Sequence, residues 1–248
     1  MTEDHAPGLE RAFVAPADQH CAPRAEGEVP AFLRGTYYLN GPACFERGGQ
    51  PYRHWLDGDG MVCALRFGAE GPRLTARYVR GTRRTEEEAA GRPLYRSFGT
   101  AFPDDKLVRG VALESPLNVS IYPYGGRLLA FGEQGLPWEL DAETLETRGP
   151  FAFGGALNPL SPFAAHPKVD PATGELFNFG VNFAAEPVLN LYRFDAGGDL
   201  VYRRRLPLGI PASIHDFLLS ERHAIFHVGP YLVDMSRLAA GGTLMDAL

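Results

Sequence analysis

Glycine and proline divide this sequence into short segments from end to end. Among its 248 residues are 29 Gly and 21 Pro, scattered between runs that are rich in β-branched and aromatic residues. Both residues are disfavoured inside helices and common in tight turns, so long helices cannot form across most of the chain. The pattern predicts an all-β fold of many short strands joined by tight turns.

Strands are expected wherever such a run is bounded by Gly, Pro, Asp or Asn. The expected strands are 36–39, 61–67, 74–79, 119–122, 127–131, 176–181, 189–194, 201–206 and 224–228. One helix is predicted, at Thr85–Gly91, because a Thr cap precedes an acidic turn and a Gly closes the segment. Residues 1–29 show no periodicity and are expected to form an irregular N-terminal arm.

Turns that begin with aspartate recur in the second half of the chain, at Asp141, Asp170 and Asp195. Because Asp caps its own turn and a following Gly takes a positive φ, each turn is expected to join two strands as a hairpin. The turns are 29 and 25 positions apart (141 to 170, 170 to 195), closer than the ~40–50 residues of a propeller repeat. Sandwiches, barrels and propellers therefore all remain open from the pattern alone.

Charge and cysteine content limit the kinds of binding partner and the cellular compartment that can be expected. The chain has 24 Lys plus Arg against 30 Asp plus Glu, a formal charge of −6, which argues against nucleic acid as a partner. Three Cys without a CxxC pair indicate reduced thiols and no structural zinc site. No apolar run approaches the ~20 residues of a transmembrane segment, and 1–10 is acidic, unlike a secretory signal. A cytoplasmic protein is expected.

Histidines are the first candidates for chemistry, since imidazole suits iron, zinc and copper. His166 precedes a proline, and His215 follows an apolar run that resembles a strand. Either one alone is most simply a hydrogen-bonded structural histidine, and Glu133 alone is most simply a solvated strand end. His223 and His227 share a face of a predicted strand and are interpreted as structural. HExxH, GxSxG, P-loop and helix-opening GxGxxG motifs are all missing.

Seven short segments occur in an order that carries more information than any one of them. They are 32–42 (FLRGTYYLNGP), 54–61 (HWLDGDGM), 117–120 (LNVS), 133–141 (EQGLPWELD), 144–149 (TLETRG), 165–175 (beginning AHPK) and 214–217 (IHDF). Together they resemble the carotenoid cleavage oxygenases, the family that includes β-carotene-cleaving enzymes and the retinal pigment epithelium isomerase. The resemblance covers residues 32–217, and the shared order argues strongly against coincidence.

This resemblance implies a fold and a metal site. The family fold is a seven-bladed β-propeller with iron(II) on its axis, held by four histidines from different blades. His166 and His215 match the first two ligands, and Glu133 matches a carboxylate that orients a ligand imidazole and offsets the charge of the ion. His54 belongs to a motif that does not ligate. Family members are much longer, so residues 30–248 are expected to be a partial propeller whose other two ligands would follow Leu248.

The implied reaction is cleavage of a carbon–carbon double bond of a carotenoid or apocarotenoid by O2, giving aldehyde or ketone products. The implied partners are O2 and a long apolar polyene, and the resemblance allows contact with a membrane surface for substrate uptake. A stilbene-cleaving, lignostilbene-type dioxygenase is an alternative, but those enzymes typically carry Lys where this chain has Gly132. A truncated, non-catalytic propeller fragment is the alternative from another class.

Two geometric expectations follow from the proposed ligands. Two imidazoles on one octahedral ion at ~2.1 Å must bring their coordinating nitrogens to ~3 Å from each other. We therefore expect His166 and His215 to meet despite the 49 positions between them (215 minus 166). Glu133 is expected within hydrogen-bond reach of the distal nitrogen of His215.

Overall fold

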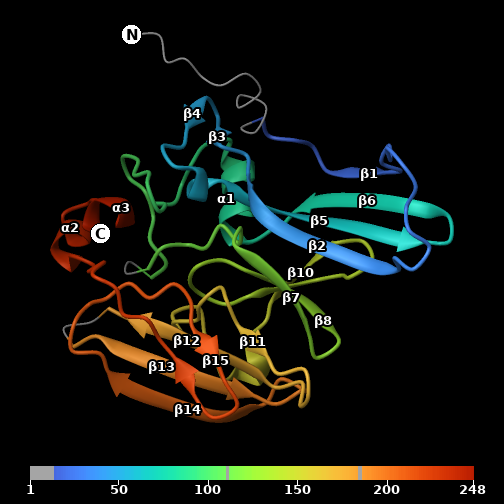
Figure 1. Ribbon diagram of the computed structural model, residues 1–248. Helices are drawn as coiled ribbons and strands as arrows, with labels where there is room; N and C mark the ends of the chain where they lie inside the picture. Colours follow the sequence, from blue (N-terminus) through green and yellow to red (C-terminus); the bar gives the residue numbers. More distant parts are fainter. Residues whose placement is uncertain (1–13, 110–111, 184–185) are drawn as a thin grey trace.

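Short antiparallel strands make up most of the regular secondary structure, in line with the all-β prediction. The structure, a computed structural model, describes residues 14–109, 112–183 and 186–248. Residues 1–13 of the expected arm lie outside the described residues. Figure 1 shows three larger sheets in succession, with the C-terminal helices at one side.

Each of the three larger sheets has four strands, and strands that lie side by side in them pair antiparallel. The first sheet, in spatial order, contains β1 (Gln19–Cys21), β6 (Gly71–Tyr78), β5 (Asp59–Gly68) and β2 (Gly35–Ala43). The second contains β10 (Thr147–Pro150), β9 (Trp138–Leu140), β8 (Arg127–Phe131) and β7 (Ser120–Tyr124). The third contains β11 (Lys168–Val169), β12 (Leu176–Asn182), β13 (Val188–Phe194) and β14 (Leu200–Pro207).

Smaller elements complete the described part of the chain. Two-stranded sheets are formed by β3 (Glu46–Arg47) with β4 (Gln50–Pro51), and by β15 (Leu218–Leu219) with β16 (Ala224–Ile225). The helices are α1 (Thr82–Ala90), α2 (Met235–Ala239) and α3 (Leu244–Ala247), with 3-10 turns η2 (Trp55–Asp57) and η3 (Phe153–Gly155). Among the described residues, no helix is long and apolar enough to cross a membrane.

The aspartate turns form hairpins as predicted. The side chain of Asp141 accepts hydrogen bonds from the backbone of Thr144 and its neighbour in the turn from β9 to β10. Asp170 caps the turn from β11 to β12, and Asp195 accepts three backbone N–H bonds between β13 and β14. Gly198 takes a φ of 101°, the positive φ that this last turn needs.

Several sequence expectations need correction. Gln19–Cys21, within the supposedly irregular arm, pairs with β6 as β1. The helix predicted at Thr85 begins at Thr82, although Gly91 closes it with a φ of 63° as expected. The predicted strand at 224–228 is only two residues long. α2 and α3 were not predicted; a capping box between Thr243 and Asp246 starts the latter.

Aromatic and aliphatic side chains fill the spaces between neighbouring sheets. Phe131 of the second sheet and Phe194 of the third belong to one buried cluster, together with Phe153 and Phe163. Val62 of the first sheet and Leu128 of the second belong to another. These contacts hold the three sheets against one another, so strands far apart in sequence present their ends to a common region.

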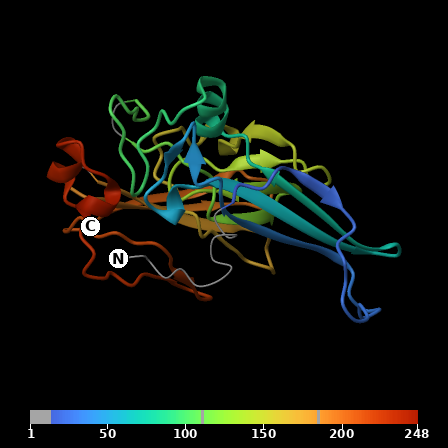
Figure 2. The ribbon, with the colours of Figure 1, turned by 90° about the horizontal axis from the view of Figure 1, so that it is seen from above.

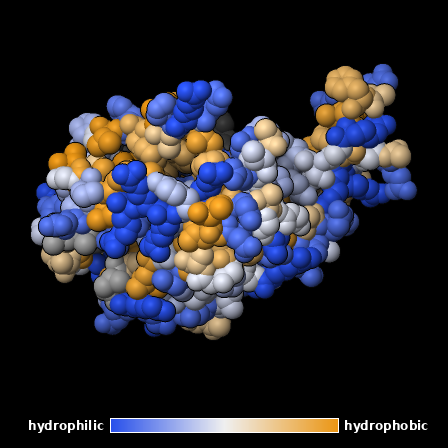
Figure 3. All heavy atoms as spheres, turned by 90° about the horizontal axis from the view of Figure 1, so that it is seen from below, coloured by the Kyte–Doolittle hydropathy of each residue, from blue (hydrophilic) through white to orange (hydrophobic). Residues whose placement is uncertain are grey.

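The first sheet extends away from the rest of the molecule, as Figure 2 shows from above. Phe32 is 86% exposed, and Tyr37 and Leu39 are 62% and 54% exposed. The last two alternate along β2, so they share one face of an edge strand. Apolar side chains at the end of this projection are visible in Figure 3. This sheet therefore presents an uncovered apolar face.

Candidate metal centre

His166 follows a buried segment that two different sheets hold in place. Ala165, directly before it, is fully buried, and its carbonyl accepts a hydrogen bond from the hydroxyl of Ser120 on β7. The carbonyl of Ala164 accepts a bond from the side-chain amide of Asn178 on β12, at 2.9 Å. Side chains of both sheets thus hold the backbone at the point where the imidazole leaves the chain.

His215 projects from an irregular segment between the third sheet and β15, rather than from the strand-like run that the sequence suggested. Its neighbours Ile214 and Phe217 are buried and pack in the cluster that includes Phe179. The side chain of His215 is itself 64% exposed. The segment is therefore anchored by apolar side chains while the imidazole stays accessible.

The two imidazoles meet, as expected from the sequence. The Nε2 atoms of His166 and His215 are 2.9 Å apart, and the rings are inclined at 72°. Adjacent nitrogen ligands on one ion at ~2.1 Å would be separated by ~3 Å. The spacing therefore fits two ligands of one metal ion that occupy neighbouring coordination positions.

Glu133 lies against the far side of the His215 ring. Both of its carboxylate oxygens are 3.0 Å from Nδ1 of His215, so that nitrogen donates its hydrogen to the carboxylate. A proton on Nδ1 leaves the lone pair of Nε2 free, which is the tautomer that a metal ion requires. This lone pair faces Nε2 of His166.

The surroundings shift the pKa values of the two imidazoles in opposite directions. Burial lowers the pKa of His166, and the neighbouring His215 lowers it further. The hydrogen bond to Glu133 raises the pKa of His215. His166 is thus held neutral, the form that ligates metals, while Glu133 supplies negative charge near the position of an ion.

Other histidines have different contacts. Nδ1 of His54 accepts the backbone N–H of Leu56 at 3.1 Å and caps η2, which is a structural role. His20 bonds to the hydroxyl of Thr75 in the first sheet. His223 and His227 were expected on one strand, but His227 lies beyond the end of β16. Within the described ranges, no group of three or more His, Cys, Asp or Glu side chains is placed to hold a metal ion.

Three polar residues near the centre were not assigned from the sequence. Ser120 bonds to the carbonyl next to His166, and Lys168 forms an ion pair with Asp216. All three stand in the segments that carry the family resemblance, which was the available signal. Their pairing could not be seen from spacing, because the partners lie 45 and 48 positions apart.

Known proteins of one family resemble this chain over most of its length. The family model described as retinal pigment epithelial membrane protein matches residues 14–247. The chain belongs to this family, the carotenoid cleavage oxygenases. Isoeugenol monooxygenase of Pseudomonas nitroreducens is 35% identical over 87% of this chain and 45% of its own length. Apocarotenoid-15,15'-oxygenase of Synechocystis is 35% identical over 81% of this chain and 43% of its own length.

Solved structures give the same family. A Synechocystis apocarotenoid oxygenase superimposes with a TM-score of 0.87 at 29% identity, covering 96% of this chain and 52% of that one. A cobalt-substituted form of the Synechocystis enzyme superimposes with a TM-score of 0.84. This family member thus accepts a metal ion, and the relatives named here are oxygenases. The chain spans about half the length of the relatives that it matches.

Proposed function

We propose that this chain forms part of a non-haem iron(II) dioxygenase, with His166 and His215 as metal ligands and Glu133 orienting His215. The observation that carries the proposal is the convergence of two Nε2 atoms at 2.9 Å, one of them on a ring bonded to a carboxylate. Neutral imidazoles suit iron, and the carboxylate offsets part of its charge. When bound, iron(II) supplies the O2-active, one-electron chemistry that no side chain provides.

The proposed reaction of the complete enzyme is cleavage of a carbon–carbon double bond in a carotenoid or apocarotenoid by O2, giving two carbonyl products. Relatives named as apocarotenoid and carotenoid cleavage oxygenases support this substrate class. We also propose that residues 30–248 form consecutive blades of a seven-bladed propeller. Sheets of four antiparallel strands, as found here, are the units from which propellers are built.

A phenolic substrate is the second candidate. Isoeugenol monooxygenase and a lignostilbene dioxygenase of Sphingomonas paucimobilis are 35% and 32% identical to this chain, which supports it. Gly132 argues against a lysine of the stilbene-cleaving type beside Glu133. A Cβ atom on Gly132 would lie 1.8 Å from the hydroxyl of Ser115, so a side chain there requires Ser115 to move. We therefore favour the polyene.

The test uses this chain and a version extended by the C-terminal half of the Synechocystis apocarotenoid oxygenase, each purified with and without the His166→Ala substitution. We expect the extended protein to contain iron and to bleach an apocarotenal in an O2-dependent reaction, and the substitution to abolish both. Cleavage of isoeugenol or a lignostilbene in place of the polyene would establish the phenolic alternative. An extended protein that neither contains iron nor turns over substrate would support the alternative that this chain is a non-catalytic propeller fragment.

A further inference from the structure

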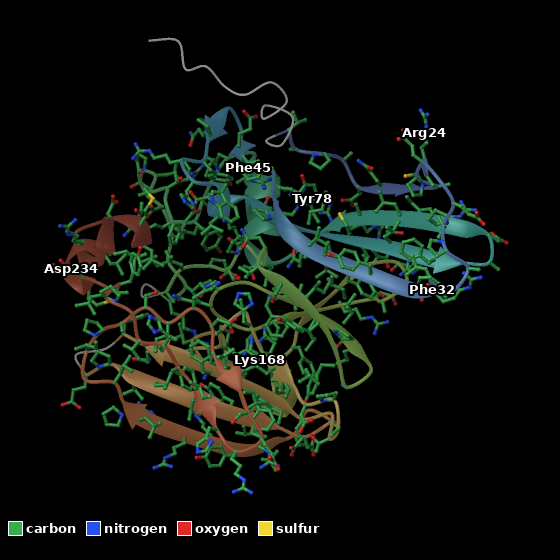
Figure 4. All side chains as sticks on the ribbon, in the orientation of Figure 1. Arg24, Phe32, Phe45, Tyr78, Lys168 and Asp234 are labelled. Atoms are coloured by element: carbon green, nitrogen blue, oxygen red, sulfur yellow. The ribbon has the colours of Figure 1, made fainter. Side chains whose placement is uncertain are left out.

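A second polar contact joins the two segments that carry the imidazoles. Nζ of Lys168 lies 2.7 Å from Oδ1 of Asp216. Lys168 stands two positions after His166, and Asp216 directly follows His215. The same two segments are therefore linked twice, once through the imidazoles and once through this ion pair. In Figure 4, Lys168 lies where β11 approaches β15.

Both members of the ion pair are fixed by further contacts. The oxygen of Asp216 that accepts from Lys168 also accepts the backbone N–H of Phe217, at 2.7 Å. Nζ of Lys168 lies 5.4 Å from the centre of the Phe217 ring, which is buried and packs edge-on against Phe179. The ion pair is thus seated on the apolar cluster beneath the His215 segment.

Two connections constrain the segments more than one does. A single contact between the imidazoles fixes their separation but lets one segment pivot about it. A second contact two residues away removes that pivot, and the ring of Pro167 stiffens the backbone between His166 and Lys168. The relative orientation of the rings is then set before any ion arrives.

Stability does not account for this ion pair. The side chain of Lys168 is 28% exposed and that of Asp216 is 48% exposed. Ion pairs with such exposure contribute little to folding stability. Metal sites, in contrast, require ligands held within ~0.5 Å and ~10–20° of the productive geometry. Small changes in orientation therefore affect metal affinity far more than they affect folding.

We propose that Lys168 and Asp216 are positioning residues that hold the imidazoles of His166 and His215 in the orientation required for two ligands of one ion. The inference rests on the proposed metal centre. It goes beyond that centre in naming two residues that touch neither the ion nor the substrate.

The test measures the imidazole pair with and without metal in the 248-residue protein. The variants are Lys168→Met, Asp216→Asn and the charge-swapped Lys168→Asp/Asp216→Lys. Arg193→Met is the matched control, because Arg193 forms a 2.6 Å ion pair with Glu175 on the same sheet, with 45% of its side chain exposed. Thermal unfolding of every variant checks that it folds.

The metal measurement uses Cu²⁺, which binds imidazole sites most tightly of the first-row divalent ions. His166→Ala gives the background from other histidines. We expect each single substitution to weaken specific Cu²⁺ binding about tenfold and to change the nitrogen couplings in the electron paramagnetic resonance spectrum. The charge-swapped variant should recover most of the affinity, and Arg193→Met should retain all of it. Unchanged affinity and spectra in both single variants would overturn the proposal.

The metal-free measurement separates this inference from the proposed function. Nuclear Overhauser effects between the ring protons of His166 and His215 report the contact directly. We expect them in the wild type, in Arg193→Met and in the charge-swapped variant, and expect their loss in the folded single variants. Wild-type Cu²⁺ binding equal to that of His166→Ala would count against the metal centre. Ring contacts that persist in both single variants would count against the positioning role, whatever the metal result.

Discussion

At the scale of single residues, Glu133 decides which nitrogen of His215 is available. Its carboxylate accepts a hydrogen bond from Nδ1–H, so Nε2 faces His166 with a free lone pair. A neutral hydrogen-bonding group in its place would still hold the ring but would no longer stabilise its positive form. The tautomer and the pKa of His215 therefore depend on this one side chain.

Replacing Glu133 with Gln is expected to lower the pKa of His215, because the carboxylate that raises it is lost. Metal affinity should fall about 10- to 100-fold, the range found when partners of ligand histidines are removed. Nitrogen-15 NMR of the metal-free protein gives the pKa and the tautomer, and Cu²⁺ titration gives the affinity. Glu146→Gln, at a side chain that is 68% exposed, is the control. A His215 pKa that is the same in both variants would contradict the assignment.

At the scale of elements, apolar runs bounded by turn residues predicted the longer strands well. The shortest elements contain too few residues for such a pattern to predict them. β5, β8, β12 and β13 all lie where apolar runs between Gly, Asp or Asn placed them. β1 has only three residues and owes its strand form to pairing with β6, a contact that no local pattern encodes. The site follows the same rule: the resemblance identified its residues, but their meeting depends on packing between sheets.

The segment before β7 carries a carboxylate that responds to pH. Burial raises the pKa of Glu114 to about 7, and Glu86 of α1 raises it as well. Between the unfolded value of about 4.5 and this folded value, the folded chain keeps a proton that the unfolded chain releases. This contribution to stability is complete below pH 4.5 and is lost as the pH rises through 7.

Replacing Glu114 with Gln should remove that dependence. As the pH rises from 4.5 to 7, the free energy of unfolding of the variant is expected to increase relative to that of the wild type. Above pH 7 this relative increase should amount to about 1–3 kcal/mol. Urea unfolding at pH 5, 6 and 8 measures the difference, with Glu26→Gln, whose side chain is 86% exposed, as the control. Parallel stability curves for Glu114→Gln and wild type would show that the carboxyl titrates normally.

Gly180 on β12 couples its strand to the segment that leads to His166. A Cβ atom at this position would lie 2.2 Å from the backbone of Pro162. Gly180→Ala is therefore expected to destabilise the fold by about 1–3 kcal/mol and to displace the imidazole. Gly68→Ala on β5, where a Cβ meets nothing within 4 Å, should change stability by less than about 0.5 kcal/mol. Chemical denaturation of both variants tests this. Equal stabilities would show that the segment at Pro162 moves without cost to accommodate the added methyl group.

At the scale of the whole molecule, two features of the described chain bear on metal binding and on association. Two imidazoles converge, while the described residues offer no third side chain at their meeting point. Tyr37 and Leu39 line an edge strand whose apolar face is uncovered, and Phe32 projects beyond it. Both depend on how segments far apart in the sequence pack and pair, so local sequence patterns alone did not predict them.

We expect the 248-residue chain on its own to hold iron weakly and to self-associate. With two imidazoles as the protein ligands, the other coordination positions are left to water, which lowers affinity and lets the ion exchange or oxidise. The open edge of β2 offers unpaired backbone groups beside apolar side chains, and such edges pair with other chains.

Three measurements on the purified chain check this expectation: iron content, mass in solution by light scattering, and carotenoid absorbance after iron(II) is added in air. Substoichiometric iron, a mass above that of one chain and unchanged absorbance are expected. Tyr37→Lys/Leu39→Lys should reduce self-association without changing the imidazole pair, because both side chains lie on the uncovered face of the first sheet. Met245→Lys on α3, away from any sheet edge, is the control. Bleaching by the 248-residue chain at a rate comparable to that of the extended protein would show instead that two imidazoles from this chain suffice for turnover.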